Sequence, residues 1–348
     1  KTTLPDYGML SSGLSSFHAT ARNPWDPTKT PGGSSAGAGA AAAAGYGPLH
    51  VGTDIGGSIR LPAGWCGVFG LKPSLGRIPI DPPYPGRVAG PMTRSVADAA
   101  LLMAELSRPD WRDAMSLPYQ ALDWSALEPE LRGLRLGLLL DAGWGLPLDA
   151  ETRTAVEAAA RAFEAAGAFV EPIGPMSTRA MVDGLDRFWR LRFWLDLEAL
   201  APAERERVLP YIRRWVADAA GLSGPEVYRG HAQMAALRDA AVAACQPYDY
   251  VLSPVSPVPA FAAGLASPID DPERPFEHIA YTLPYNMSEQ PAASVPCAMT
   301  AGGLPIGLQI AGRRHDDLGV LRLARAWEHL RPPLPAWPEP RGETPARA

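Results

Sequence analysis

The apolar positions of this chain fall into short continuous runs and into longer stretches with helical spacing. Short apolar runs bounded by turn residues are typical of buried strands. They predict strands over residues 48–51, 134–140, 169–171, 250–252, 292–299 and 306–311. The strand, helix, strand order between residues 134 and 171 indicates an α/β sheet that is covered by helices.

Helices are predicted over residues 36–46, 95–106, 149–166, 176–245 (in large part) and 318–330. The first consists of small apolar residues, which favours a buried helix packed closely on other backbone. Ser95 and Asp98 form a capping box at the start of the second helix. Asp149 is placed to cap the third, and Gly167 ends it.

The chain of 348 residues is long enough to bury a sizeable core. Hydrophobic residues make up 47% and charged residues 20%, as is typical of soluble globular proteins. We predict one domain over residues 1–335 and a loose tail, rich in Pro, Glu and Arg, over residues 336–348.

Net charge and cysteine content narrow the range of partners. A formal charge of −5 and a pI near 5.7 favour neither nucleic acid nor an anionic membrane as a partner. Cys66, Cys245 and Cys297 match no disulfide framework and no zinc pattern, so we expect buried free thiols in a cytoplasmic protein. No spacing typical of a metal site is present, and no cofactor is expected.

Two serine sites in glycine-rich loops are the main chemical feature. Gly32-Gly33-Ser34-Ser35 precedes the alanine-rich helix, and Gly56-Gly57-Ser58 follows the strand after it. Glycine beside serine leaves the hydroxyl uncovered and lets the backbone adopt unusual dihedral angles. It also lets successive N–H groups converge, as an oxyanion hole requires. The pattern suggests a nucleophile on one loop and its proton partner on the other.

Ser58 is the predicted nucleophile. The alternative is a phosphate-binding glycine loop, which is disfavoured because the Walker lysine and the G-x-G-x-x-G spacing are absent. Asp54 would also repel a phosphate there. A second alternative, Asp54 as the aspartate of a catalytic triad, needs a histidine, and none of the six lies in a triad-like context.

The serine loops and several flanking blocks resemble the amidase signature family. The resemblance extends from Lys1 to about His329 and is densest before residue 100. It is carried by Gly32-Gly33-Ser34-Ser35, Gly52-Thr53-Asp54-Ile55-Gly56-Gly57-Ser58-Ile59-Arg60, Cys66-Gly67-Val68-Phe69-Gly70-Leu71-Lys72-Pro73-Ser74, Tyr285-Asn286 and Gly303-Leu304-Pro305-Ile306-Gly307-Leu308-Gln309. The family implies the amidase signature α/β fold, a mixed central sheet with helices on both faces.

The resemblance also implies roles for individual residues. Ser58 would attack a carboxylic amide, and Ser34, on a cis peptide bond, would relay the proton. The implied oxyanion hole consists of the backbone N–H groups of Ile55, Gly56, Gly57 and Ser58. We expect Ser35 to support the site by hydrogen bonding or to cap the helix after it.

The sequence also suggests residues that support the nucleophile loop and segments that bind the substrate. Asp54 and Arg60 flank the nucleophile with opposite charges, so we expect a buried ion pair that holds the loop. Residues 8–18 and 188–194 are candidates for the substrate pocket, although helix packing is the favoured role for most aromatic side chains of the second segment. The expected partner is a small-molecule amide, and a second copy of the chain is the other partner considered.

The lysines depart from the family pattern. The family uses a Ser–Ser–Lys triad whose lysine precedes the first glycine loop, whereas this chain has only Lys1, Lys29 and Lys72, none in that context. We therefore expect the fold to be incomplete at its N-terminal side and the chain alone to be inactive. An apolar cleft or an unpaired sheet edge beside Ser34 should mark the place of the absent segment.

Three functional hypotheses follow. The first is a stand-alone amidase, and the third is a non-catalytic fragment or pseudoenzyme. The second is the glutamine-hydrolysing component of a glutamyl-tRNA amidotransferase, its A subunit, which releases ammonia from glutamine. The acidic composition and the opening Lys1-Thr2-Thr3-Leu4-Pro5-Asp6-Tyr7, which is closer to general amidases, favour the first hypothesis over the second.

Overall fold

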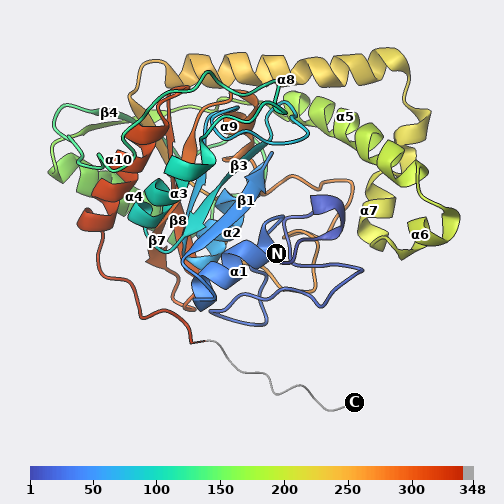
Figure 1. The fold of residues 1–348 in the computed structure, drawn as a ribbon, viewed down its shortest axis with the longest axis horizontal. Helices are drawn as coiled ribbons and strands as arrows, with labels where there is room; N and C mark the ends of the chain where they lie inside the picture. The colour runs from blue at the N-terminus through green and yellow to red at the C-terminus, as the bar shows by residue number, and fades with distance from the viewer. Residues whose placement is uncertain (340–348) are drawn as a thin grey trace.

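A computed structural model describes residues 1–339 and contains one eight-stranded sheet (Figure 1). The strand order is β1-β3-β2-β7-β8-β6-β4-β5. The strands are β1 (Leu49–Asp54), β2 (Phe69–Lys72), β3 (Val88–Thr93), β4 (Arg135–Leu139), β5 (Phe169–Ile173), β6 (Tyr250–Pro254), β7 (Ala292–Met299) and β8 (Pro305–Gly312). β4 pairs in parallel with β5 and β6, and the other pairs are antiparallel, so the sheet is mixed, as predicted.

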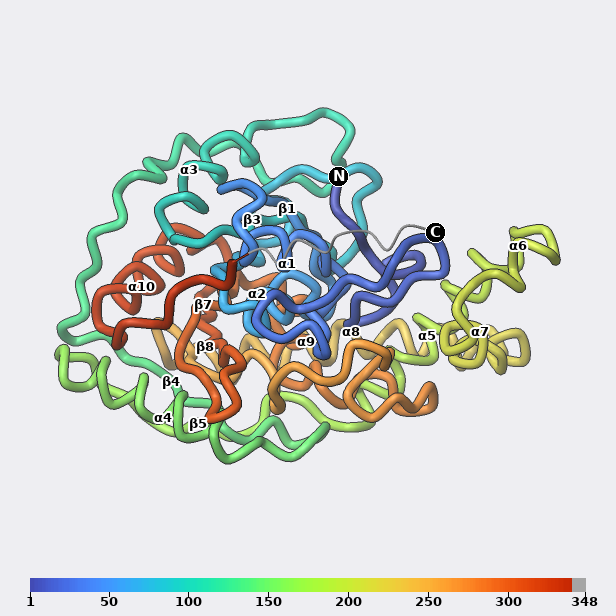
Figure 2. Tube along the Cα trace, turned by 90° about the horizontal axis from the view of Figure 1, so that it is seen from below, coloured from blue at the N-terminus to red at the C-terminus, as the bar shows by residue number. Residues whose placement is uncertain are grey.

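Helices cover both faces of this sheet. They are α1 (Ala36–Ala44), α2 (Arg60–Cys66), α3 (Val96–Leu106), α4 (Ala150–Ala165), α5 (Arg179–Glu198), α6 (Pro202–Arg207), α7 (Pro210–Trp215), α8 (Gly224–Cys245), α9 (Leu283–Met287) and α10 (Asp317–Leu330), with 3-10 turns η1 (Asp6–Gly8) and η2 (Ala217–Gly221). Figure 1 shows α3, α4 and α10 together on one side, and Figure 2 shows α6 and α7 far from them, at the opposite end of the molecule.

Strand residues divide between two apolar cores by strict alternation. On β6, Val251 belongs to the core under α5 and α8, whereas Leu252 belongs to the core under α3, α4 and α10. β8 repeats the pattern with Ala311 and Ile310. Successive side chains of a strand point to opposite faces of the sheet, so these continuous apolar runs are buried on both sides.

Local capping signals in the sequence are confirmed. The Ser95 hydroxyl accepts a hydrogen bond from the Asp98 N–H at 3.1 Å and begins α3. The Asp149 carboxylate accepts one from the Thr152 N–H at 2.9 Å and begins α4. These caps satisfy helix N–H groups that have no partner inside the helix.

The first strand differs from its prediction. β1 is longer than expected and lies at the sheet edge, where Leu49 and Val51 are 39% and 46% exposed, so it is not a buried strand. Among the described residues it pairs only with β3, and its other edge is unpaired. The predicted docking of a further segment beside the Ser34-Ser35 loop stays a prediction. β2, β3 and α2 were not predicted.

The three cysteines are buried and free, as predicted. No helix within residues 1–339 combines the length and the apolar character of a membrane span. Trp337 packs on Trp25, with ring centroids 6.1 Å apart, and under the guanidinium of Arg94. Residues 340–348 lie outside the described residues, and the division into a domain and a tail stays a prediction.

Candidate active site

The nucleophile loop links the end of β1 to the start of α2. Ser58 is half-buried in it, just before the first turn of α2. Gly57 has a φ of 128°, and a Cβ atom there would lie 2.6 Å from the Thr282 hydroxyl oxygen. Only glycine fits this backbone and this contact, so the loop keeps its shape through the Gly-Gly-Ser sequence.

The Gly33–Ser34 peptide bond is cis, as predicted. A Cβ atom on Gly33 would lie 2.6 Å from the Leu10 carbonyl oxygen, so the chain approaches here too closely for a side chain. The Ser35 N–H donates to the Ser58 carbonyl at 3.2 Å. The two serine loops are therefore in direct contact.

The proton relay itself is not formed in this structure. Within residues 1–339, no hydrogen bond joins the hydroxyls of Ser34 and Ser58, and no lysine is bonded to Ser34. The proposed roles of both serines stay predictions. Among the described residues, no group of three or more His, Cys, Asp or Glu side chains is arranged to hold a metal ion.

Of the two roles expected for Ser35, the structure shows hydrogen bonding beside the site and no helix cap. Ser35 occupies the N-cap position of α1, but its hydroxyl makes no capping bond. Instead the hydroxyl accepts from the Thr53 N–H at 3.1 Å and donates to the Thr53 carbonyl at 3.2 Å. It therefore satisfies the backbone of the open edge of β1 beside the nucleophile loop.

The predicted oxyanion hole is changed at one position. The Gly57 N–H donates to Oδ1 of Asp54 at 2.8 Å and is thus already engaged. Within the described part of the chain, the N–H groups of Ile55, Gly56 and Ser58 have no hydrogen-bond partner. These three remain available to an incoming oxyanion.

Asp54 and Arg60 form the predicted ion pair at 2.9 Å, with both side chains completely buried. Burial alone would raise the pKa of Asp54. The charge and hydrogen bonds of Arg60, assisted by a hydrogen bond from Asn286, outweigh burial and lower that pKa to about 2. Asp54 also accepts from the Ile59 N–H at 3.1 Å. The pair therefore fixes the loop on both sides of Ser58.

Arg60 also ties this loop to the distant end of the chain. Its guanidinium donates to the Thr282 carbonyl at 2.8 Å, to Gln309 Oε1 at 2.8 Å and to Asn286 Oδ1 at 2.6 Å. Sequence reasoning assigned no role to these three residues. The available signal was that Asn286 and Gln309 lie in blocks that resemble the family.

Lys72 on β2 is fully buried near this network. Its Nζ donates to the Pro73 carbonyl at 2.9 Å. Burial, followed by the charge of Arg60, lowers the pKa of Lys72 to about 7. Among the described residues no hydrogen bond joins its ammonium group to Ser34, so Lys72 is not assigned as the base expected behind Ser34.

A cavity opens beside Ser58. Its walls come from both predicted segments and from residues that were not predicted: Gly8, Met9, Leu10, Ser11, Ile55, Gly56, Ser58, Trp189, Arg192, Phe193, Trp215, Phe276 and Ile279. Phe276 packs edge-on against Trp189 and Trp215, with centroids 5.2 and 5.6 Å away. Phe188, in contrast, packs against His231, as expected of a helix-packing residue.

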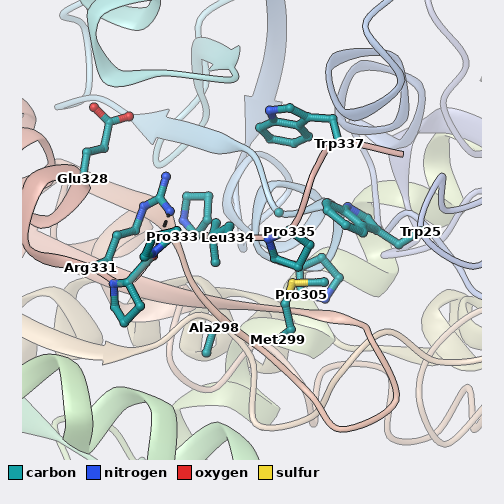
Figure 3. A pocket seen from close by; sticks show the side chains of 13 residues that line it. Trp25, Ala298, Met299, Pro305, Glu328, Arg331, Pro333, Leu334, Pro335 and Trp337 are labelled. Atoms are coloured by element: carbon teal, nitrogen blue, oxygen red, sulfur yellow. Dashed lines mark hydrogen bonds between the residues drawn. The ribbon is translucent and has the colours of Figure 1, made fainter. Parts of the chain in front are cut away.

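A larger hollow lies elsewhere, between Trp25, the end of β7 and the Pro-rich segment after α10 (Figure 3). Figure 3 shows mainly proline and tryptophan side chains around it, with Glu328 and Arg331 at one end. No serine, cysteine or histidine lines this hollow. The candidate active site is therefore the smaller cavity beside Ser58.

Comparison with known proteins agrees with this geometry. The family model described as Amidase matches residues 1–321. A curated relative, the A subunit of the glutamyl-tRNA(Gln) amidotransferase of Myxococcus xanthus (strain DK1622), is 37% identical over 363 aligned positions, which cover 94% of this chain and 73% of the relative.

Two solved structures share the fold. A bacterial aryl acylamidase of the amidase signature family has a TM-score of 0.83 and 30% identity, covering 94% of this chain and 71% of the other. The 6-aminohexanoate cyclic dimer hydrolase, complexed with substrate, has a TM-score of 0.85 and 27% identity, covering 95% and 74%.

The fold and the site are thus those of an enzyme that acts on amide bonds, with amidase-type catalysis. The chain belongs to the amidase signature family.

Proposed function

We propose that this chain hydrolyses a carboxylic amide through an acyl-enzyme on Ser58. The Ser58 hydroxyl attacks the carbonyl carbon, and the oxyanion accepts hydrogen bonds from the free N–H groups of the loop. The relay then protonates the leaving nitrogen, and water releases the acid. The observation that carries this proposal is a half-buried serine at a cavity, in a loop with unpaired backbone N–H groups.

The proposed proton path runs from Ser58 through Ser34 to a neutral lysine. Neither Lys1 nor Lys29 nor Lys72 is bonded to Ser34 in the described structure, so none is assigned as the base. General-base assistance contributes about 10²–10⁴-fold to such reactions. We therefore expect turnover to depend on the lysine that serves as this base.

Curated relatives favour glutamine as the amide. Besides the Myxococcus protein, relatives with 33–35% identity bear the same description, the A subunit of a glutamyl-tRNA(Gln) amidotransferase. If this chain acts in such a complex, partner subunits and tRNA belong to its function. The expectation of no nucleic-acid partner would then be wrong.

A stand-alone amidase for a bulkier amide is the second candidate. It is supported by the aromatic walls of the cavity, Trp189, Trp215 and Phe276, and by the similarity to an aryl acylamidase. For either candidate, a cytoplasmic location stays a prediction.

Labelling with a serine-directed fluorophosphonate tests the nucleophile. We expect modification of Ser58 and none in Ser58→Ala, whereas labelling of another serine in both proteins contradicts the proposal. Ammonia release from glutamine, measured with and without amidotransferase partner subunits, tests the first substrate candidate. Hydrolysis of an aryl amide without partners supports the second.

A further inference from the structure

Arg192 is the one cationic side chain that lines the cavity beside Ser58. It projects from α5, and its guanidinium carbon lies 4.2 Å from the ring centroid of Tyr84 and 4.9 Å from that of Phe193. Stacking on two aromatic rings orients the planar guanidinium and leaves N–H groups for a further ligand.

Arg87 reinforces this positive charge. It approaches from the segment before β3, and its Nε is buried without a hydrogen-bond partner, while another of its nitrogens donates to the Pro82 carbonyl. Burial and then the charge of Arg192 lower the pKa of Arg87. The positive charges of Arg87 and Arg192 therefore act on each other and on Tyr84.

Neither guanidinium is neutralised by an acidic side chain. Within residues 1–339, no ion pair includes Arg87 or Arg192. On the same helix, Arg190 pairs with Asp186 at 2.8 Å, and Arg179 pairs with Glu277 at 2.7 Å. Arg192, which lines the cavity of the candidate nucleophile, is thus without an acidic partner.

The remaining walls of the cavity contain no acidic side chain that could pair with a positively charged group of a ligand. None of the cavity-lining residues is Asp or Glu, and most are aromatic or aliphatic. An ammonium group on the ligand would have no carboxylate to pair with and would lie near two cations. Unpaired charges of this kind are costly to desolvate.

We propose that Arg192, assisted by Arg87, binds a carboxylate at the far end of the amide substrate, and that this site disfavours a ligand with an additional ammonium group. The substrate class is a monoamide with an apolar body and a terminal carboxylate. A guanidinium fork matches the two oxygens of a carboxylate, and such charge-assisted bonds are among the stronger ones in proteins. This inference rests on the proposed function for the position of the scissile amide, and it disfavours glutamine, the first substrate candidate, because glutamine carries an ammonium group. Binding of the carboxylate does not require turnover.

Calorimetric binding to the full chain carrying Ser58→Ala tests the site without hydrolysis. The probes are monoamides of linear dicarboxylic acids with about five to eight carbons, so that the distance between amide and carboxylate varies along the series. Each is compared with an isosteric amide in which isopropyl replaces the carboxylate. Glutamine is compared with glutaramate, which differs from it only in lacking the ammonium group.

We expect the best carboxylate probe to bind about 10- to 100-fold more tightly than its isopropyl partner. Arg192→Gln should abolish this difference, and Arg192→Lys should keep part of it, which also controls for folding. Arg187→Gln removes the same charge from an exposed position of α5 and should change nothing. Glutaramate should bind more tightly than glutamine.

Equal binding of the carboxylate and isopropyl probes, or no binding of either, overturns the inference. So does an equal effect of Arg192→Gln and Arg187→Gln. Tighter binding of glutamine than of glutaramate overturns the exclusion of an ammonium group. If the carboxylate preference holds while fluorophosphonate fails to label Ser58, the anion site stands and the proposed function fails.

Discussion

The two walls of the cavity beside Ser58 are held in different ways. On one wall, the nucleophile loop is fixed by a buried ion pair, by hydrogen bonds from its own backbone to Asp54 and by the links of Arg60 to Asn286 and Gln309. On the other wall, Trp189, Phe276 and their neighbours make ring contacts with few polar bonds. The first wall contains the groups for the chemical step. The second wall determines the shape of the cavity and contains one cation without an acidic partner, Arg192.

This difference indicates how the molecule separates catalysis from specificity. Directional hydrogen bonds and a buried charge pair permit only a narrow set of residues and positions. Aromatic packing accepts exchanges of similar volume more readily. We therefore expect substitutions on the first wall to abolish function or unfold the protein, and those on the second to change substrate preference.

The largest effect is expected for Ser58→Ala. In any preparation that hydrolyses amides, it should reduce turnover by at least about 10³-fold, because the acyl-enzyme cannot form. Initial-rate assays and a thermal unfolding curve measure this, and the unfolding midpoint should be unchanged. Ser125→Ala, at an exposed serine, is the control and should retain full activity. Normal turnover in Ser58→Ala would remove Ser58 from the mechanism.

The next largest effect is expected when Arg60 is removed from its ion pair with Asp54. Arg60→Met should lower the free energy of unfolding by about 3–5 kcal/mol, because it leaves the Asp54 carboxylate buried without its cation. The comparison is Arg135→Met, which removes an exposed pair with Glu171 and should cost far less stability. Denaturant unfolding measures both. Similar losses for the two variants would show that the nucleophile loop is not held by its charge pair.

Removing the buried charge of Lys72 should have the opposite effect on stability from removing that of Arg60. The pKa of Lys72 in the folded state is about 7, below that of an unfolded chain, so unfolding takes up a proton between pH 7 and about 10. Stability should therefore rise with pH across this window. Lys72→Met should flatten that rise and stabilise the protein by about 1–3 kcal/mol at pH 7.

Denaturant unfolding from pH 6 to pH 10 measures the effect of Lys72→Met. Lys29→Met, which removes an ammonium group from a half-buried side chain, is the control. A loss of stability in Lys72→Met at pH 7, or an unchanged pH profile, contradicts the prediction.

The smallest effects are expected on the aromatic wall. The Trp215 indole N–H donates to Asp186 at 2.8 Å, whereas the Trp189 indole N–H is buried without a partner. Trp215→Phe should therefore cost about 1–2 kcal/mol more than Trp189→Phe, since both remove a similar volume from buried positions. Unfolding in denaturant compares them directly. Equal losses would mean that packing alone determines the stability of this wall.

Local signals in the sequence predicted the fold class and the chemical centre. The caps at Ser95 and Asp149 involve residues three positions apart, so their geometry follows from short-range sterics and hydrogen bonding. The same is true of the Gly57–Ser58 turn, which glycine alone permits. Charge complementarity within one short loop was enough to predict the Asp54–Arg60 pair.

Elements whose stability comes from distant partners were missed. β2 and β3 each contain a glycine, and β3 also a proline, and both lack a clear alternating pattern. They are strands because they pair with each other and with β7 and β1. β1 was expected to be buried, but the strand order places it at an edge. Strand position in a sheet is a property of the whole topology, which no short window of sequence contains.

The sequence by itself determined the backbone of the nucleophile loop, the position of Ser58 in it and the ion pair that holds it, because these depend on residues within a few positions of one another. Only the tertiary structure decided that Asn286 and Gln309 complete the network of Arg60, and that the Gly57 N–H is committed to Asp54. It also decided that Arg192, unpaired, lines the same cavity as Ser58. These arrangements depend on sheet register and helix packing, which bring together side chains from remote parts of the chain.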